Sequence, residues 1–354
     1  MSESFRLRAE EALLPSIVAL LIALILGDVL ILMFGESPAH VYSRMIEGAW
    51  GNPYGFAQVL YKTTTLTFAG LGIALALRAG LFNIGAEGQL AAGAFGAAIV
   101  GISLPAGTPG LVAVPLCLLG AAAGGLLTGG LPGVLKAKFG AHEVIVTIML
   151  NFVVLALLNW LIVERLRTAD TLHTPEINAG AVPRLSEFIP AFHGSAANVT
   201  FFFAIAAAIW CWWYLFRTPG GYALRATGLQ PDAAEYSGIR VGRVWIKAMA
   251  LGGMLAALGG TNFVLGYKHY YEDGFTGGSG FLAIAVAIVG RNHPFGVVIA
   301  AFFFATLSQG GLAIHALVPK QMVEVLQGIV ILAMAAAVPE VQRALRSARK
   351  VVAA

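Results

Sequence analysis

The sequence has little charge and almost no cysteine. Only 11% of its 354 residues are Asp, Glu, Lys or Arg, whereas 58% are hydrophobic, and the mean hydropathy is +0.81. A water-soluble domain of this length cannot hide so much apolar surface, so we expect an all-α bundle of transmembrane helices. The two cysteines, Cys117 and Cys211, lie inside apolar segments and indicate small buried side chains instead of a disulfide framework.

Common catalytic motifs are missing as well. The chain contains no G-x-x-x-x-G-K-[ST] phosphate loop, no G-x-S-x-G and no H-E-x-x-H, so we predict neither an enzyme nor a bound cofactor. His142 has no second His or Cys at ligand spacing, and no metal site is expected there. The formal charge of +4 comes from loops between apolar segments, where membrane topology explains it, and nucleic acid is not an expected partner.

Ten apolar segments are present, and we expect them to form a single transmembrane domain over 1–354. One of them, 279–290, is too short to cross ~30 Å of hydrocarbon, which indicates a half-helix or a re-entrant piece. The ten predicted spans are 13–34, 56–77, 83–102, 110–134, 143–163, 199–216, 245–265, 279–290, 295–315 and 321–339.

The distribution of basic residues predicts the orientation. With the N-terminus inside, fifteen of the 22 Lys and Arg residues fall on the inner side of the ten spans. Because cytoplasmic loops carry an excess of Lys and Arg, both termini are expected in the cytoplasm. Residues 164–198 then form an external loop, and residues 217–244 form the largest internal loop.

Polar side chains interrupt the third apolar segment. Asn83, Glu87 and Gln89 are costly in lipid and normally face a bundle interior or a water-filled path. Asn83 and Glu87 are four residues apart and are expected to share one helix face. Gly88, Ala92 and Gly96 form a smooth strip within 88–96, on which another helix can pack closely.

A second polar line opens the fifth segment. Glu143, Thr147 and Asn151 are spaced by four residues and lie on one face of the expected helix. Interhelical hydrogen bonding explains such a line, and direct contact with a substrate is the alternative. Other polar residues in or near apolar segments are individually typical of helix packing, namely Asp28, Asn262, Glu324 and Gln327.

The internal loop contains a short predicted helix. Pro231 suits the first helical position, Asp232 and Glu235 lie near the positive end of the helix dipole, and Gly238 ends the helix. A second helical stretch, 222–227, precedes it. The loop is either an ordinary cytoplasmic loop or a docking element for a soluble motor subunit, which would help to order so short a helix. The residues assigned to docking are Pro231, Asp232, Ala233, Ala234, Glu235, Tyr236 and Gly238.

Three motifs together resemble the permease subunits of bacterial ABC importers for ribose, branched-chain amino acids and nucleosides. The stretch 78–89 is similar to the family signature, and 221–239 is similar to its coupling region. The stretch 140–151 resembles the nucleoside branch, which is associated with basic membrane lipoproteins. Leu229-Gln230-Pro231 departs from the pattern, since relatives often carry an acidic or amide residue after the glycine, and this leaves docking details open.

The resemblance implies a type II importer fold in the bacterial inner membrane. It implies two permease chains, plausibly a heterodimer, two cytoplasmic ATP-binding subunits and an external substrate-binding lipoprotein. A nucleoside is the expected cargo, with Asn83 and Asn151 near its path, Glu87 ordering helix packing, and Gln89 as a further pathway candidate.

Other functions remain open at this point. Ribose-like sugars and branched-chain amino acids are alternative cargoes. An ion-coupled secondary transporter, with Asp28, Glu87 or Glu324 as the coupling carboxylate, is a less favoured class. A structural or receptor protein is disfavoured by the intramembrane polar residues.

Overall fold

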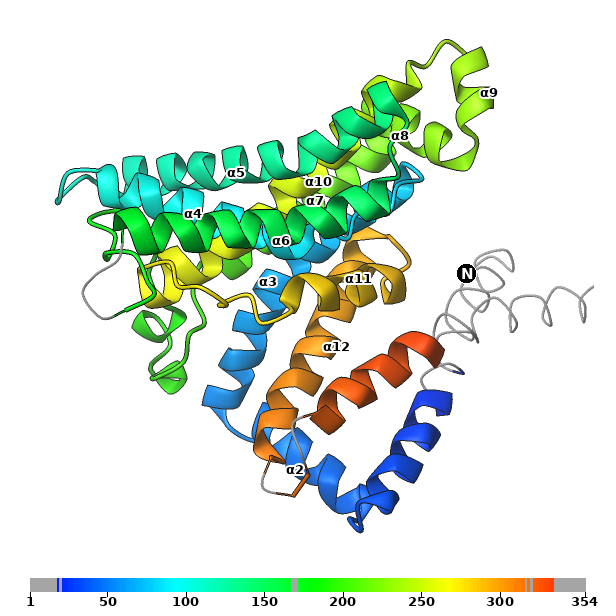
Figure 1. The fold of residues 1–354 in the computed structure, drawn as a ribbon. Coiled ribbons are helices and arrows are strands. Elements are labelled where there is room, and N and C mark those ends of the chain that lie inside the picture. Colours follow the sequence, from blue (N-terminus) through cyan, green and yellow to red (C-terminus); the bar gives the residue numbers. More distant parts are fainter. Residues whose placement is uncertain (1–17, 19–20, 167–170, 316, 319–320, 334–354) are drawn as a thin grey trace, which may run out of the picture. The chain divides into compact units, whose positions relative to one another are not determined.

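The computed structural model describes residues 18, 21–166, 171–315, 317–318 and 321–333, and within them it contains helices but no strands (Figure 1). The chain divides into two compact units, one of residues 1–55 with 306–354 and the other of residues 56–305. The principal helices are α2 (Pro38–Trp50), α3 (Pro53–Arg78), α4 (Ala86–Ser103), α5 (Gly110–Phe139), α6 (Glu143–Leu161), α7 (Thr200–Arg217), α8 (Pro219–Leu229), α9 (Pro231–Tyr236), α10 (Val241–Phe263), α11 (Ser279–Val289) and α12 (Pro294–Ala313).

The smaller unit contains the first and last described helices. The helix Leu21–Met33 bends by 108° into α2, a turn that the sequence did not predict because 38–50 was not recognised as helical. The helix Gln321–Ala333 belongs to the same unit. Its apolar core consists of Ile31, Val41, Met45, Ile314, Val318, Met322 and Val323. The predicted spans 13–34 and 321–339 extend outside the described residues.

The larger unit is built around α10. A Cβ added at Gly253 would overlap the backbone of α5 at Gly125, and one added at Gly252 would overlap the backbone of α3 at Gly72. On the third side, Gly260 packs against α4 at Ala94. Glycine on three faces lets three neighbouring helices approach the α10 backbone closely, which maximises van der Waals contact where lipid offers no hydrophobic drive.

The smooth strip of α4 packs as the sequence indicated. Gly96 faces Gly120 of α5, and Ala92 faces Gly124 of the same helix, with backbone atoms in near contact. Gly88, at the start of the strip, lies against Asn151 of α6. The strip therefore serves two neighbouring helices at once.

The short segment α11 is a half-helix. Its eleven residues rise about 16 Å, roughly half of the hydrocarbon thickness. Non-helical chain leads into it from His269 to Gly278, and Gly278 adopts a left-handed φ of 82°. Such irregular backbone is tolerated at membrane depth only where protein surrounds it.

Each predicted apolar segment contains a helix where it is described, apart from short ends such as 83–85, but ten spans are not confirmed. By length and hydropathy, six described helices can cross a membrane, or seven if the bent pair counts as one span. The segment α4 falls outside this group because Glu87, Gln89 and its glycines lower its hydropathy. Most of α4 is buried by protein, so it does not need a lipid-like surface.

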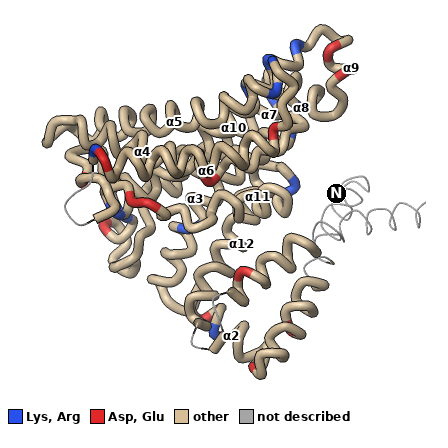
Figure 2. Tube along the Cα trace, viewed as in Figure 1, with Lys and Arg blue, Asp and Glu red and all other residues tan. Residues whose placement is uncertain are grey.

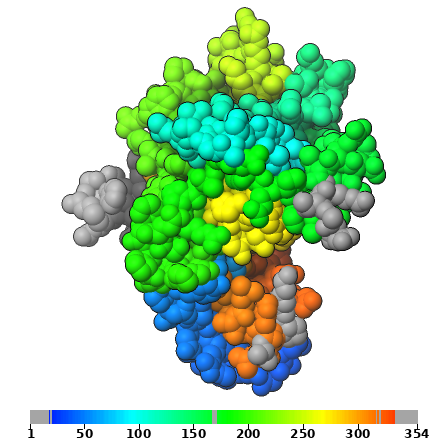
Figure 3. Space-filling model, turned by 90° about the vertical axis from the view of Figure 1, so that its left-hand side faces the viewer, coloured from blue at the N-terminus to red at the C-terminus, as the bar shows by residue number. Residues whose placement is uncertain are grey.

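The predicted external loop is held against the chain that follows α10. The amide N–H of Thr174 donates to the Tyr271 carbonyl over 2.9 Å, and that of Ile177 donates to the His269 carbonyl over 2.8 Å. In Figure 3 the green residues of this loop border the yellow residues beyond α10. The loop thereby supplies partners for the irregular backbone that leads into α11.

The close packing of α10 yields a stability prediction. In Gly253→Ala, the new Cβ would lie 2.7 Å from the Cα of Gly129, and α5 and α10 must separate. We expect a loss of about 1–3 kcal/mol, measured as a lower melting temperature of the purified protein in detergent.

The matched control is Gly130→Ala, one position from the same contact. Its Cβ would meet nothing closer than 3.6 Å, at Ala250. Since Ala favours helix over Gly, this variant should be as stable as the parent or slightly more so. Equal melting temperatures for the two variants would contradict the packing argument.

Candidate functional site

The carboxylate of Glu87 lies between the N-termini of two helices. It belongs to the first turn of α4, and it accepts hydrogen bonds from the backbone N–H groups of Gly278 (2.9 Å) and Gly280 (2.7 Å) at the start of α11. Only 6% of the residue is exposed. Both helix dipoles present their positive ends to this carboxylate, which stabilises its negative charge.

Gly280 makes this contact possible. A Cβ at position 280 would overlap the backbone N–H of Glu87 and lie 2.5 Å from its Cα. The two helix starts can therefore approach closely enough for one side chain to satisfy two free N–H groups of α11. In this arrangement Glu87 joins α4 to α11.

Asn83 precedes α4 instead of lying on it, so the predicted helix face shared with Glu87 is wrong. Gly80 has a φ of 76°, which ends the helical path after α3, and α4 starts only at Ala86. The Asn83 Oδ1 accepts the Gly85 N–H over 2.9 Å, a local turn that competes with helix. Its Nδ2 donates to Gln89 Oε1 over 3.0 Å, so Asn83 and Gln89 are direct partners.

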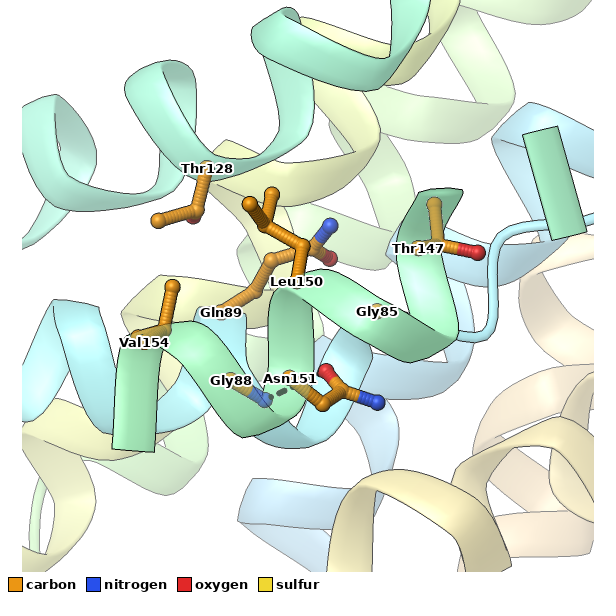
Figure 4. Close-up of a pocket in the computed structure, with 8 residues that line it drawn as sticks. All are labelled: Gly85, Gly88, Gln89, Thr128, Thr147, Leu150, Asn151 and Val154. Atoms are coloured by element: carbon orange, nitrogen blue, oxygen red, sulfur yellow. Dashed lines mark hydrogen bonds between the residues drawn. The ribbon is translucent and has the colours of Figure 1, made fainter. Parts of the chain in front are cut away.

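The polar line of α6 packs on this same segment (Figure 4). The Oγ1 of Thr147 accepts the Ile84 N–H over 3.2 Å. The Asn151 amide accepts the Gly88 N–H over 2.9 Å and donates to the Ile84 carbonyl over 2.8 Å. The interhelical hydrogen bonding that the sequence allowed is thus present, and it serves backbone groups of a non-helical stretch.

Glu143, the first member of the line, has a different partner. Its carboxylate forms an ion pair with Lys136 of α5 over 2.9 Å, and the Lys136 ammonium also lies 5.6 Å from the ring centroid of Trp245. The residues of the polar line therefore have two different structural roles. Its first turn ties α6 to α5, and its next two turns hold the start of α4.

A narrow crevice lies between the polar residues of α4 and α6 and the helix α5, and it is not a ligand cavity. It is too narrow to admit a water molecule. Asn83, Gln89 and Asn151 are each at most 3% exposed. The residues that line the crevice are Gly85, Gly88, Gln89, Thr128, Thr147, Leu150, Asn151 and Val154 (Figure 4).

A second buried polar network joins α3, α7 and α10, and most of it escaped sequence analysis. The Asn262 Oδ1 accepts from Asn198 Nδ2 (2.9 Å) and from Thr200 Oγ1 (2.8 Å), and the Asn262 Nδ2 donates to Thr65 Oγ1 (2.9 Å). Asn262 stood out as a lone amide in an apolar segment. Asn198 and Thr200 did not, because they sit at a segment boundary where polar residues are ordinary.

The internal loop folds into two short helices, and α9 has the predicted bounds Pro231–Tyr236. Before it, α8 extends beyond the predicted 222–227 stretch, because the Thr218 hydroxyl caps it by accepting the Gly221 N–H over 3.1 Å. Gly238 has a φ of 85° and ends α9 as expected.

Not all of the residues that were assigned to docking are exposed on this helix pair. Tyr236 is 97% exposed and Leu229 is 85% exposed, so both large apolar side chains point away from the unit. Ala233 is exposed as well, but Ala234 is only 4% exposed and is already buried within this chain. Ala234 is therefore not available to a partner surface.

The helix pair touches the end of α3, just before the polar network, through a glycine. A Cβ at Gly228 of α8 would overlap the carbonyl of Arg78, the last residue of α3, and would lie 2.9 Å from the N of Gly80. The segment that carries Asn83 begins directly after this contact. Among the described residues, no group of three His, Cys, Asp or Glu side chains is placed to hold a metal ion.

The Glu87 contact predicts a clear loss of stability in Glu87→Gln. The amide has one acceptor oxygen, so one of the two α11 N–H groups would face an NH₂ donor in a buried site. We expect a loss of about 1.5–3 kcal/mol, measured by thermal unfolding in detergent.

Glu235→Gln on the exposed surface of α9 is the control, because it makes the same chemical change without a buried partner. It should alter the free energy of unfolding by less than about 0.5 kcal/mol. If Glu87→Gln and this control have the same melting temperature, the carboxylate does not hold α11 in place.

Comparison with known proteins assigns the chain to a family. The family described as "Branched-chain amino acid transport system / permease component" matches residues 55–335. The guanosine ABC transporter permease protein NupP of Bacillus subtilis (strain 168) is 36% identical, over 90% of this chain and 92% of its own length. No solved structure matches the chain.

Two further relatives have similar coverage. The nucleoside ABC transporter permease protein NupB of Lactococcus lactis subsp. cremoris (strain MG1363) is 32% identical, over 86% of this chain and 84% of its own length. The glucose ABC transporter permease protein TsgB13 of Haloferax volcanii is 32% identical, over 89% of this chain and 85% of its own length. With its apolar helices and buried polar network, the chain belongs to this family of permease components and is a multi-pass membrane protein.

Proposed function

We propose that this chain is the membrane-spanning subunit of an ATP-driven importer for nucleosides. The observation that carries the proposal is the similarity, over nine-tenths of the chain, to a guanosine permease, together with the similarity to a second nucleoside permease. The 140–151 motif, whose Thr147 and Asn151 hold the start of α4, points to the same branch.

In this proposal ATP is hydrolysed by separate cytoplasmic subunits, because the sequence contains no phosphate loop. The helix pair α8–α9 is the docking element for them. Its support is the exposure of Leu229 and Tyr236, two large apolar side chains on a short projecting element. Pro231, Asp232, Glu235 and Gly238 shape and end α9 beside them.

The polar network is proposed to border the cargo path. Asn83, Glu87, Gln89 and Asn151 all contribute to holding the starts of α4 and α11, and Gly80 links this region to Gly228 of α8. Movement of α8 under the motor subunits would act on the segment before α4. The amides of Asn83 and Asn151 would then exchange internal partners for groups of a passing nucleoside.

The remaining partners follow from the same proposal. An external substrate-binding lipoprotein delivers the nucleoside, and the inner membrane of a bacterium is the location, with both termini in the cytoplasm. A second, different permease completes the pathway, which is supported by the similarity of this chain to two different guanosine permeases of Bacillus subtilis, NupP and NupQ.

Sugar import is the second candidate, and the similarity to a glucose permease favours it specifically. Ion-coupled transport through Glu87 has weaker support, since both carboxylate oxygens accept backbone N–H groups of α11. A coupling carboxylate must exchange its partners for an ion or a proton during each cycle.

A reconstituted system tests the cargo. Vesicles containing both permeases, the ATP-binding subunits and the binding protein should accumulate labelled guanosine in the presence of ATP. They should not accumulate glucose or leucine above the level of vesicles given a non-hydrolysable ATP analogue. Uptake of glucose without guanosine would overturn the nucleoside assignment.

Tyr236→Ala tests the docking element. Loss of an exposed aromatic anchor should weaken binding of the ATP-binding subunit by about 2 kcal/mol or more, with a matching loss of uptake. Co-purification of the subunits at a series of concentrations measures this affinity.

Phe139→Ala removes another aromatic side chain, 75% exposed at the end of α5 and outside the helix pair. It should leave assembly and uptake unchanged. If Tyr236→Ala binds the ATP-binding subunit as tightly as the parent protein does, docking at this end of α9 is excluded. Ala234→Glu is unsuitable because it would bury a charge within the chain.

A further inference from the structure

Aromatic and basic side chains form a continuous strip where α7 ends. The ring of Trp212 lies 6.1 Å from that of Phe295, Phe295 lies 5.8 Å from His293, and His293 lies 5.5 Å from Phe216. A guanidinium group stands at each end. Arg217 lies 5.5 Å from the Trp212 centroid, and Arg225 of α8 lies 5.2 Å from the Phe216 centroid. We call these six residues the basic aromatic strip.

Arg225 lacks an anionic partner within the described chain. Its Nε is buried and donates to no acceptor, and the residue forms no ion pair among the described residues. The acidic residues of the following helix, Asp232 and Glu235, do not reach it. Its guanidinium lies over the face of Phe216. The buried Nε is out of reach of an external anion, but the Nη groups of this half-buried guanidinium are not buried and can pair with one, which would compensate its charge.

Arg78 provides an internal comparison. Its guanidinium lies 5.9 Å from the same Phe216 ring, but its Nε donates to the Asn292 carbonyl over 2.9 Å. Arg78 is thus occupied by the chain between α11 and α12, whereas Arg225 is not.

The surroundings of Arg225 are electropositive. Arg78 and Arg225 flank one ring and repel each other in a partly apolar environment. Burial, and then the positive charge of Arg78, hold the pKa of His293 below its usual range. The region therefore attracts an anion.

The neighbouring surface indicates that the anion comes from lipid. Beside the strip, α7 exposes Trp213 and Ile209, and α12 exposes Phe295 and Ile299, on helices long and apolar enough to span the membrane. Figure 2 shows Lys and Arg gathered where α7 and α8 meet, next to long uncharged stretches. Aromatic rings with adjacent cations at the end of a span are typical of the level of the lipid headgroups.

We propose that the basic aromatic strip binds the phosphate of an anionic phospholipid. The phosphate pairs with the guanidinium of Arg225, the rings of Phe216 and Phe295 contact the glycerol and upper acyl region, and Arg217 adds attraction at the other end. Because Arg225 belongs to α8 and Phe216 to α7, the bound lipid would hold α8 against the end of α7. Lipid binding does not depend on which cargo the permease carries.

The test is lipid binding to the purified full-length chain in phosphatidylcholine nanodiscs. Phosphatidylglycerol is titrated in, and bound lipid is counted by native mass spectrometry. Arg225→Gln should lower the affinity for phosphatidylglycerol about fivefold or more, and Arg217→Gln should lower it by a smaller factor. Arg225→Lys should retain part of the binding, since the charge remains.

Arg243→Gln is the matched control, because Arg243 is an exposed arginine outside the strip. The affinity of this variant for phosphatidylglycerol should equal that of the parent protein. Millimolar inorganic phosphate should not displace the lipid from the parent protein. An equal loss in the control, equal binding of phosphatidylcholine, or displacement by phosphate would each overturn the proposal. So would unchanged lipid binding in Arg225→Gln together with loss of the ATP-binding subunit, because the strip would then be a protein interface. If Arg225→Gln does not fold, Arg217→Gln at the exposed end decides the question.

Discussion

A backbone N–H group inside a bilayer has no water to bind, and the larger unit is organised around meeting that constraint. The chain interrupts its helices twice, before α4 and before α11, and each interruption leaves N–H groups without helical partners. Glu87 satisfies two of them at the start of α11. Asn83, Thr147 and Asn151 satisfy those around the start of α4. The same side chains that are costly in lipid are therefore the ones that make broken helices possible in this membrane protein.

Close helix packing makes these side-chain contacts possible. Gly280 brings the start of α11 onto the backbone of Glu87, and Gly88 brings α4 onto Asn151. Around them, the glycines of α10 fix three helices at short distance. The polar network and the glycine contacts are two parts of one arrangement, because a hydrogen bond of 2.7–2.9 Å to a backbone N–H requires that the two helices nearly touch.

A packing contact connects the exposed helix pair with the end of α3, which leads into this network. On the outward side, α8 and α9 present Leu229 and Tyr236, and on the inward side Gly228 rests on the end of α3. The next residues along the chain lead through Gly80 to Asn83. In the proposed importer, an ATP-binding subunit that displaces α8 would act on the segment whose hydrogen bonds set the start of α4. The basic aromatic strip reaches the same helix from the side of α7, so a lipid bound there would influence the same element.

The sequence by itself determined the helical membrane class, the positions of most helices and the bounds of α9, because hydropathy, proline and glycine act locally. The resemblance of three motifs to known permeases indicated the family. The sequence also identified Glu87 and Asn151 as polar groups that need partners. Tertiary structure alone decided what those partners are. Asn83 instead lies outside the helix in a local turn, in which its amide bonds Gly85 and Gln89, and the four-residue spacing from Glu87 did not reveal this turn. Ala234 turned inward although nothing in its neighbours marks it. The bend before α2 and the half-helix contact of Gly280 with Glu87 depend on residues distant in sequence, which local periodicity does not contain.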